Sequence, residues 1–151
     1  MTDERRCLVL ANQTLCGERL LELVAERVAT GPHAFHVVVP ATPVRDQEGP
    51  PGGGDDDVLT APTRAYALAQ QRLDRAVEQI RAAGATASGE VGDPDPLVAA
   101  ELALKHVRAD EVVVVTLPLG LSRWLRGGLP ARVGRASGLP VQHVVEEAVP
   151  G

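Results

Sequence analysis

The chain has 151 residues, of which 44% are hydrophobic, and a formal net charge of -5. This length and composition favour one globular domain with a substantial core and exclude a disordered chain. The acidic balance and an aromatic content of 2% argue against nucleic acid as a partner, because phosphate backbones need a basic surface and exposed bases need stacking platforms.

The first third of the sequence reads as strand, helix, strand. Residues 7–11 form a continuous apolar run, which is typical of a strand buried on both faces of a sheet. A polar turn containing Asn12 and Thr14 follows. Apolar residues at helical spacing then predict a helix over residues 18–29, which a glycine-proline pair ends. A second apolar run predicts a strand at residues 35–39.

The chain changes character after this second strand. Residues 43–62 contain a triple glycine, a triple aspartate and several prolines without any hydrophobic period, which predicts a flexible loop within the domain. We interpret the aspartates at 55–57 as solvated charges rather than metal ligands. Helical spacing resumes over residues 63–83, and a run of small residues at 85–91 predicts the third strand.

The second half continues the alternation. Asp95 is placed to cap a helix that begins at Pro96. Residues 112–115 form an apolar β-branched run, a helical segment carrying arginines follows at 121–128, and the last strand closes the unit at 139–145. Five strands and four helices therefore alternate. This predicts a Rossmann-like, three-layer α/β/α sandwich around a five-stranded parallel sheet in the order 3-2-1-4-5.

The predicted order places a ligand site at the switch point between the first and fourth strands, at their carboxyl ends. Glycine amides at a helix amino end can hold phosphate, and Arg123 and Arg126 share a helix face and can clamp one anion. The alternative to anion binding is that these arginines are simply exposed to solvent. For Asn12 and Thr14, the alternative to contacting a ligand is that their side chains form hydrogen bonds within the turn. The candidate binding residues are Asn12, Thr14, Thr116, Gly120, Ser122, Arg123, Arg126, Gly127 and Gly128.

No catalytic or metal-binding motif stands out in the sequence. A Ser-His-Asp arrangement, a Walker lysine and paired carboxylates in a recognisable motif are all missing. The histidines fall in separate predicted elements without ligand spacing; they are His33, His36, His106 and His143. We therefore predict no catalytic residues and no metal ligands.

Cysteine usage and apolar run lengths point to the reduced cytoplasm. Cys7 and Cys16 make neither a disulfide framework nor a metal pattern. Segment 1–6 leads into a short apolar run rather than a signal-peptide core, and no run approaches the roughly 20 residues that span a bilayer. Lys105 is the only lysine, and this arginine bias suggests a GC-rich bacterial genome. We expect a cytoplasmic bacterial protein without membrane contact.

Three short motifs at fixed places in this pattern carry a resemblance to a known family. They are Gly92-Asp93-Pro94 before the third helix, Ala109-Asp110 before the fourth strand, and Leu139-Pro140-Val141 at the last strand. With the variable loop after the second strand, they make nearly the whole chain similar to the universal stress protein family. The resemblance implies an adenine nucleotide alpha hydrolase-like fold, a homodimer formed through the last strand, and ATP or another adenine nucleotide as ligand, with Mg²⁺ left open.

The phosphate-binding motif of that family is only partly present. Its ATP-binding members carry a glycine motif after the fourth strand, G-x-x-G, nine residues, then glycine followed by serine or threonine. With the sequence aligned on Pro140-Val141, Gly127 matches the third glycine, but Val115-Thr116 takes the place of the first. Pro118 replaces an amide-donating position, Gly128 replaces the serine or threonine, and Asn12 replaces an aspartate usual in the family. These departures predict a weak or altered nucleotide affinity.

Two functions from different classes remain open. One is a non-enzymatic nucleotide-binding or regulatory module with altered affinity for ATP or AMP. The other is a ligand-free protein-interaction domain of the same fold in stress signalling. A small nucleotide hydrolase is a minor alternative, without a supporting motif.

Overall fold

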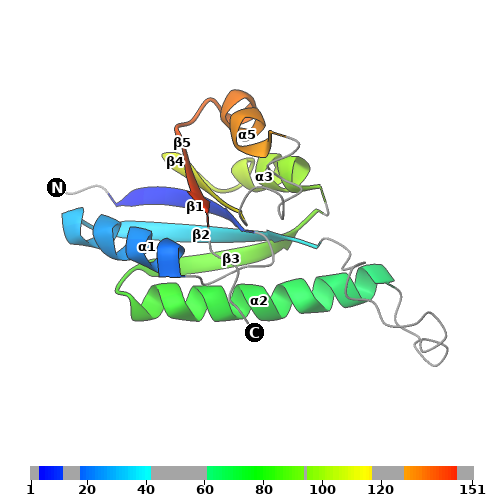
Figure 1. The fold of residues 1–151 in the computed structure, drawn as a ribbon, viewed down its shortest axis with the longest axis horizontal. Coiled ribbons are helices and arrows are strands. Elements are labelled where there is room, and N and C mark those ends of the chain that lie inside the picture. The colour runs from blue at the N-terminus through cyan, green and yellow to red at the C-terminus, as the bar shows by residue number, and fades with distance from the viewer. Residues whose placement is uncertain (1–3, 12–17, 42–60, 94, 117–127, 146–151) are drawn as a thin grey trace.

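The computed structural model describes residues 4–11, 18–41, 61–93, 95–116 and 128–145, with the backbone alone for 61–65. Strands and helices alternate through these ranges (Figure 1), as the sequence predicts. In chain order they are β1 (Arg5–Ala11), α1 (Glu18–Thr30), β2 (His33–Pro40), α2 (Ala61–Ala82), β3 (Thr86–Gly92), α3 (Pro96–Leu104), β4 (Glu111–Thr116), α5 (Leu129–Ser137) and β5 (Val141–Val145).

The five strands form one parallel sheet in the order β3-β2-β1-β4-β5, which confirms the predicted order. The chain adds β2 and β3 on one side of β1, then crosses over and adds β4 and β5 on the other side. The direction of winding therefore reverses between β1 and β4, which makes this pair the switch point of the sheet.

Helices cover both faces of the sheet, α1 and α2 on one and α3 and α5 on the other (Figure 1). Along β1, Val9 and Ala11 pack toward α1 and α2, whereas Leu8 and Leu10 pack toward α3 and α5. Successive side chains of a strand point to opposite faces. A central strand with helices on both sides therefore needs an unbroken apolar run, which is what the sequence provides.

The small residues of β3 allow close packing of helices on both of its faces. A Cβ atom added to Gly89 would collide with the Leu73 side chain of α2 and lie 2.7 Å from the carbonyl oxygen of Val37. On the other face, a Cβ atom on Gly92 would lie 2.8 Å from Cβ of Ala99 in α3. The faint apolar pattern of residues 85–91 thus reflects both the exposure of Thr86 and Ser88 and the tight packing at Gly89.

The start of α3 is set by a local cap, as predicted. Asp95 Oδ1 accepts hydrogen bonds from the backbone N–H groups of Leu97 at 2.9 Å and Val98 at 3.4 Å. Pro96 occupies the first turn, where its missing N–H has no helical partner to lose. This side-chain cap and proline explain why the helix begins here.

The structure describes a helix directly before β5, after the stretch at 121–128 where the sequence predicts one. Segment 121–127, most of the predicted arginine-bearing helix, is outside the described residues, and α5 begins at Leu129. Arg132 and Arg135, interpreted from sequence as surface charges, are exposed on α5. The predicted helix at 121–128 therefore stays a prediction, and α5 is a helix that the sequence analysis did not predict.

Residues 42–60 lie outside the described part of the chain. They include nearly all of the loop predicted at 43–62 and the whole aspartate run at 55–57. The helix that follows begins at Ala61, slightly before the predicted start at residue 63. Among the helices within the described ranges, none combines the length and apolar character needed to cross a membrane.

Candidate functional site

The carboxyl edge of the sheet brings the ends of β1 and β4 side by side. Ala11, the last residue of β1, is the register partner of Val115, and β4 ends one residue later at Thr116. The chain therefore leaves the two switch-point strands at neighbouring positions. Open parallel sheets bind ligands in the crevice outside such strand ends, so the fold supports the place predicted for the site.

Two of the nine predicted binding residues, Thr116 and Gly128, fall among the described residues. The others lie outside them: Asn12, Thr14, Gly120, Ser122, Arg123, Arg126 and Gly127. The geometry of the predicted arginine clamp and of the residues after β1 therefore stays a prediction. What the structure describes at this edge is the end of β4 and the start of α5.

Thr116 is buried, and its hydroxyl already has a side-chain partner. Its Oγ1 atom lies 2.7 Å from Nε2 of His143 in β5, and the tautomer of the imidazole decides which of them donates. Burial lowers the pKa of His143, which favours the neutral ring at pH 7. The Thr116 hydroxyl therefore joins β4 to β5, and its burial, more than this one hydrogen bond, limits its access to a ligand.

Gly128 sets the conformation at the start of α5. Its backbone is left-handed, with φ 67° and ψ 34°, and no heavy atom lies within 4 Å of where a Cβ atom would be. Glycine is favoured here because of the left-handed backbone conformation, since an added Cβ atom would meet no steric obstacle. The first N–H groups of a helix lack intrahelical partners and can bind an anion, but a glycine at this position brings no hydroxyl to a phosphate.

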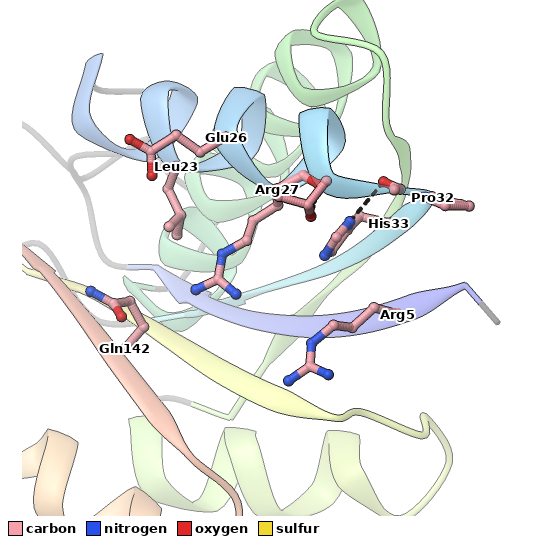
Figure 2. Close-up of a pocket in the computed structure, with 9 residues that line it drawn as sticks. Arg5, Leu23, Glu26, Arg27, Pro32, His33 and Gln142 are labelled. Carbon is pink, nitrogen blue, oxygen red and sulfur yellow. Dashed lines mark hydrogen bonds between the residues drawn. The ribbon is translucent and has the colours of Figure 1, made fainter. Parts of the chain in front are cut away.

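A cavity of about 620 Å³ lies at the opposite edge, by the amino ends of the strands (Figure 2). Arg27 reaches down from α1 toward the sheet, between Arg5 of β1 and Gln142 of β5. His33 is held at the rim, with Nδ1 2.9 Å from the carbonyl oxygen of Gly31. This edge is the wrong end of the strands for the ligand site of an open parallel sheet.

The arginines of this cavity surround a buried carboxylate. Glu111 is 4% exposed, and its Oε1 accepts a hydrogen bond from Arg27 Nη1 at 2.6 Å. Arg5 Nε lies 3.6 Å from the same oxygen, and the Cys7 thiol donates to it at 3.5 Å. We interpret the arginines as structural partners of Glu111, because an unpaired buried charge is strongly unfavourable. The signal in the sequence that could have indicated this buried ion pair is Glu111 itself, a charged residue that directly precedes the apolar run at 112–115.

The same surroundings keep the Cys7 thiol protonated. Burial, followed by the adjacent Glu111 carboxylate, raises the pKa of Cys7 to about 12. Nucleophilic and metal-binding cysteines react as thiolates. Cys7 is therefore a small buried core residue, as its apolar run suggests, and Cys16 lies outside the described residues.

Comparison with known proteins gives a clear answer for the fold. No protein-family model matches the sequence, and no curated protein is significantly similar to it. Among solved structures, a universal stress protein from Archaeoglobus fulgidus is similar over 93% of this chain and 94% of its own, with 18% identity and a TM-score of 0.57. A universal stress protein from Archaeoglobus fulgidus in complex with dAMP covers 95% of this chain and 99% of its own, with 22% identity and a TM-score of 0.51. The chain therefore has the fold of the universal stress proteins.

Proposed function

We propose that the chain is a non-enzymatic binding module for an adenine nucleotide, with its site at the carboxyl edge between β1 and β4. The observation that carries this proposal is the strand order, because it puts the reversal of winding at β1 and β4 and ligands bind at such switch points. The Archaeoglobus protein with the same fold that was solved with dAMP supports an adenine nucleotide as the ligand class.

Two features of the described residues argue for a weaker or altered affinity. The Thr116 hydroxyl is engaged by His143, and Gly128 offers a backbone amide but no side-chain hydroxyl at the start of α5. The same two features favour the second candidate, a protein-interaction domain of this fold that binds no nucleotide. Nucleotide binding is therefore the measurement that separates the two functions.

We expect ATP, ADP, AMP or dAMP to raise the melting temperature of the full chain in a dose-dependent way. A ligand at about 100 times its Kd stabilises the folded state by about 2.7 kcal/mol, or roughly 5 to 10 °C for a chain of this size. Differential scanning fluorimetry with and without Mg²⁺ measures this. The absence of a shift at millimolar nucleotide would rule out the binding module in favour of the interaction domain.

A pair of double variants tests the phosphate clamp. Replacing Arg123 and Arg126 by alanine is expected to reduce the nucleotide-dependent shift, because each arginine would donate to phosphate. Replacing Arg132 and Arg135 by alanine is the matched control, since these exposed residues have the same spacing on α5. Equal shifts in both variants would show that the clamp is wrongly assigned. Release of phosphate from ATP above the buffer background would point instead to the hydrolase.

A homodimer through β5 is part of the same proposal. Among the described strands β5 is at the edge of the sheet, so on one side it pairs with no other described strand and could pair with a second chain, and Val145 adds an apolar side chain that is 38% exposed. We expect light scattering to give twice the 15.9 kDa chain mass. A monomer at micromolar concentration would contradict this interface.

We also propose that the protein is located in the bacterial cytoplasm, which cell fractionation tests.

A further inference from the structure

Three potential metal ligands meet on the sheet face that α3 covers. His36 comes from β2, Glu90 from β3 and His106 from the turn after α3. The Nε2 atoms of both imidazoles lie 2.6 Å from the same oxygen, Glu90 Oε2. One ligand atom from each residue lies within 4.8 Å of the other two. Two imidazoles thus converge on one carboxylate from three separate elements.

Strand register and a hydroxyl group orient the first imidazole. His36 is the register partner of Ser88, and its Nδ1 atom lies 2.9 Å from Ser88 Oγ. This contact turns Nε2 toward Glu90, which lies two residues beyond Ser88 on the same face of β3. Metal-binding histidines are typically held in this way, with the second ring nitrogen hydrogen-bonded to a neighbour.

The carboxylate of the cluster is shared by both imidazoles. Glu90 Oε2 lies 2.6 Å from Nε2 of His36 and 2.6 Å from Nε2 of His106, and the Glu90 side chain is 30% exposed. An anionic oxygen beside two imidazole nitrogens is a mixed donor set that suits zinc and related transition metals. Magnesium and calcium prefer sites made of oxygen ligands alone.

We propose that His36, Glu90 and His106 bind a divalent transition-metal ion, with Zn²⁺ as the ion that fits best. Two histidines and one glutamate are a known zinc donor set that leaves a fourth position for water or an external ligand. Ligand atoms about 2.0 to 2.1 Å from a tetrahedral metal lie roughly 3.3 Å apart. The two 2.6 Å distances in the cluster would widen toward that spacing on metal binding, and His106, whose side chain is 56% exposed, has room to move.

The cluster is accessible and separate from the proposed nucleotide site. It borders a groove of about 400 Å³ that His36, Ser88 and His106 line together with Arg6 and Arg108. The groove lies toward the amino ends of β1 and β3, whereas the nucleotide site is predicted at the carboxyl ends of β1 and β4. A bound ion would join β2, β3 and the end of α3, and its fourth position would remain within reach of solvent.

Calorimetric titration of the chelator-treated full chain with ZnCl₂ tests the proposal. We expect saturable binding of one ion per chain, no comparable binding of Mg²⁺, and at least about tenfold weaker zinc binding in His106→Ala. Because His106 is largely exposed, this variant should keep its fold, which circular dichroism checks. Glu90→Gln, which keeps the size of the side chain but removes its charge, should also weaken binding. His143→Gln is the control histidine and should bind as the parent does.

A second measurement identifies the ligands directly. In NMR spectra of the histidine side chains, added zinc should move the ring signals of His36 and His106 and leave those of His33 and His143 in place. The proposal is overturned if the parent protein takes up no zinc in a saturable way, or if His106→Ala and Glu90→Gln bind it as tightly as the parent. Movement of the His33 or His143 signals alone would also overturn it.

Discussion

Replacing Arg27 by alanine is expected to lower the free energy of unfolding by about 3 kcal/mol. Arg27 is the close partner of the buried Glu111 carboxylate, with 2.6 Å between Nη1 and Oε1. Its loss leaves a buried charge whose remaining cation, Arg5, is 3.6 Å away on a half-exposed side chain. We take the low end of the range for broken buried ion pairs, because the Arg27 side chain is itself 25% exposed.

Urea unfolding of Arg27→Ala, Glu111→Gln, the double variant and one control variant measures this contribution. Glu111→Gln should be less destabilising than Arg27→Ala, because a neutral amide can still accept from Arg27 and no unpaired buried charge remains. The double variant should then recover part of the loss seen in Arg27→Ala, as expected for coupled residues. Arg132→Ala, on the exposed face of α5, is the control and should change stability by less than about 0.5 kcal/mol. If Arg27→Ala behaves like this control, the ion pair contributes little to the fold.

Replacing Phe35 by alanine is expected to lower the free energy of unfolding by about 3 to 5 kcal/mol. Phe35 lies in β2, is 1% exposed, and belongs to the core between the sheet and the α1–α2 layer. Its ring stacks on His33, with centroids 6.2 Å apart and an interplanar angle of 23°. A buried ring of this size leaves a cavity that the surrounding strands can only partly fill.

Tyr66→Ala provides a matched aromatic control on the same face of the protein. Tyr66 belongs to α2 but is 54% exposed, so its removal should change stability by less than about 0.5 kcal/mol. Thermal and urea unfolding of both variants give the comparison. Similar small losses for Phe35→Ala and Tyr66→Ala would mean that α1 and α2 do not pack on the sheet as described.

Most of the fold follows from local patterns in the sequence. Unbroken apolar runs at residues 7–11 and 112–115 predict strands covered on both faces, because alternate side chains must each meet a helix layer. The cap at Asp95 and the proline after it fix the start of α3. Alternation of strands and helices then leaves a parallel sheet with a small choice of strand orders.

The helix before β5 and the small residues of β3 show where local patterns stop being sufficient. Helix α5 begins at Leu129, after Gly128 in a left-handed conformation, and the sequence analysis did not predict it; the helix predicted at residues 121–128 lies outside the described residues. A glycine permits such a turn wherever it occurs, so composition alone does not say which one the chain uses. In β3, a Cβ atom on Gly89 would lie 2.7 Å from the carbonyl oxygen of Val37 in β2 and would collide with the Leu73 side chain of α2, and no local pattern contains these contacts.

By itself, the sequence determined the element types of most of the chain and the parallel sheet with its strand order. Only the tertiary structure decided which side chains meet. Arg27 and Glu111 are 84 residues apart, and His36 and Glu90 are 54 apart, yet each pair is in hydrogen-bonding contact. The physical reason is that burial favours apolar residues at every covered position, which leaves a periodic trace in the sequence. Contact between two polar side chains depends on strand register, sheet face and helix placement, which are fixed only when the whole chain packs.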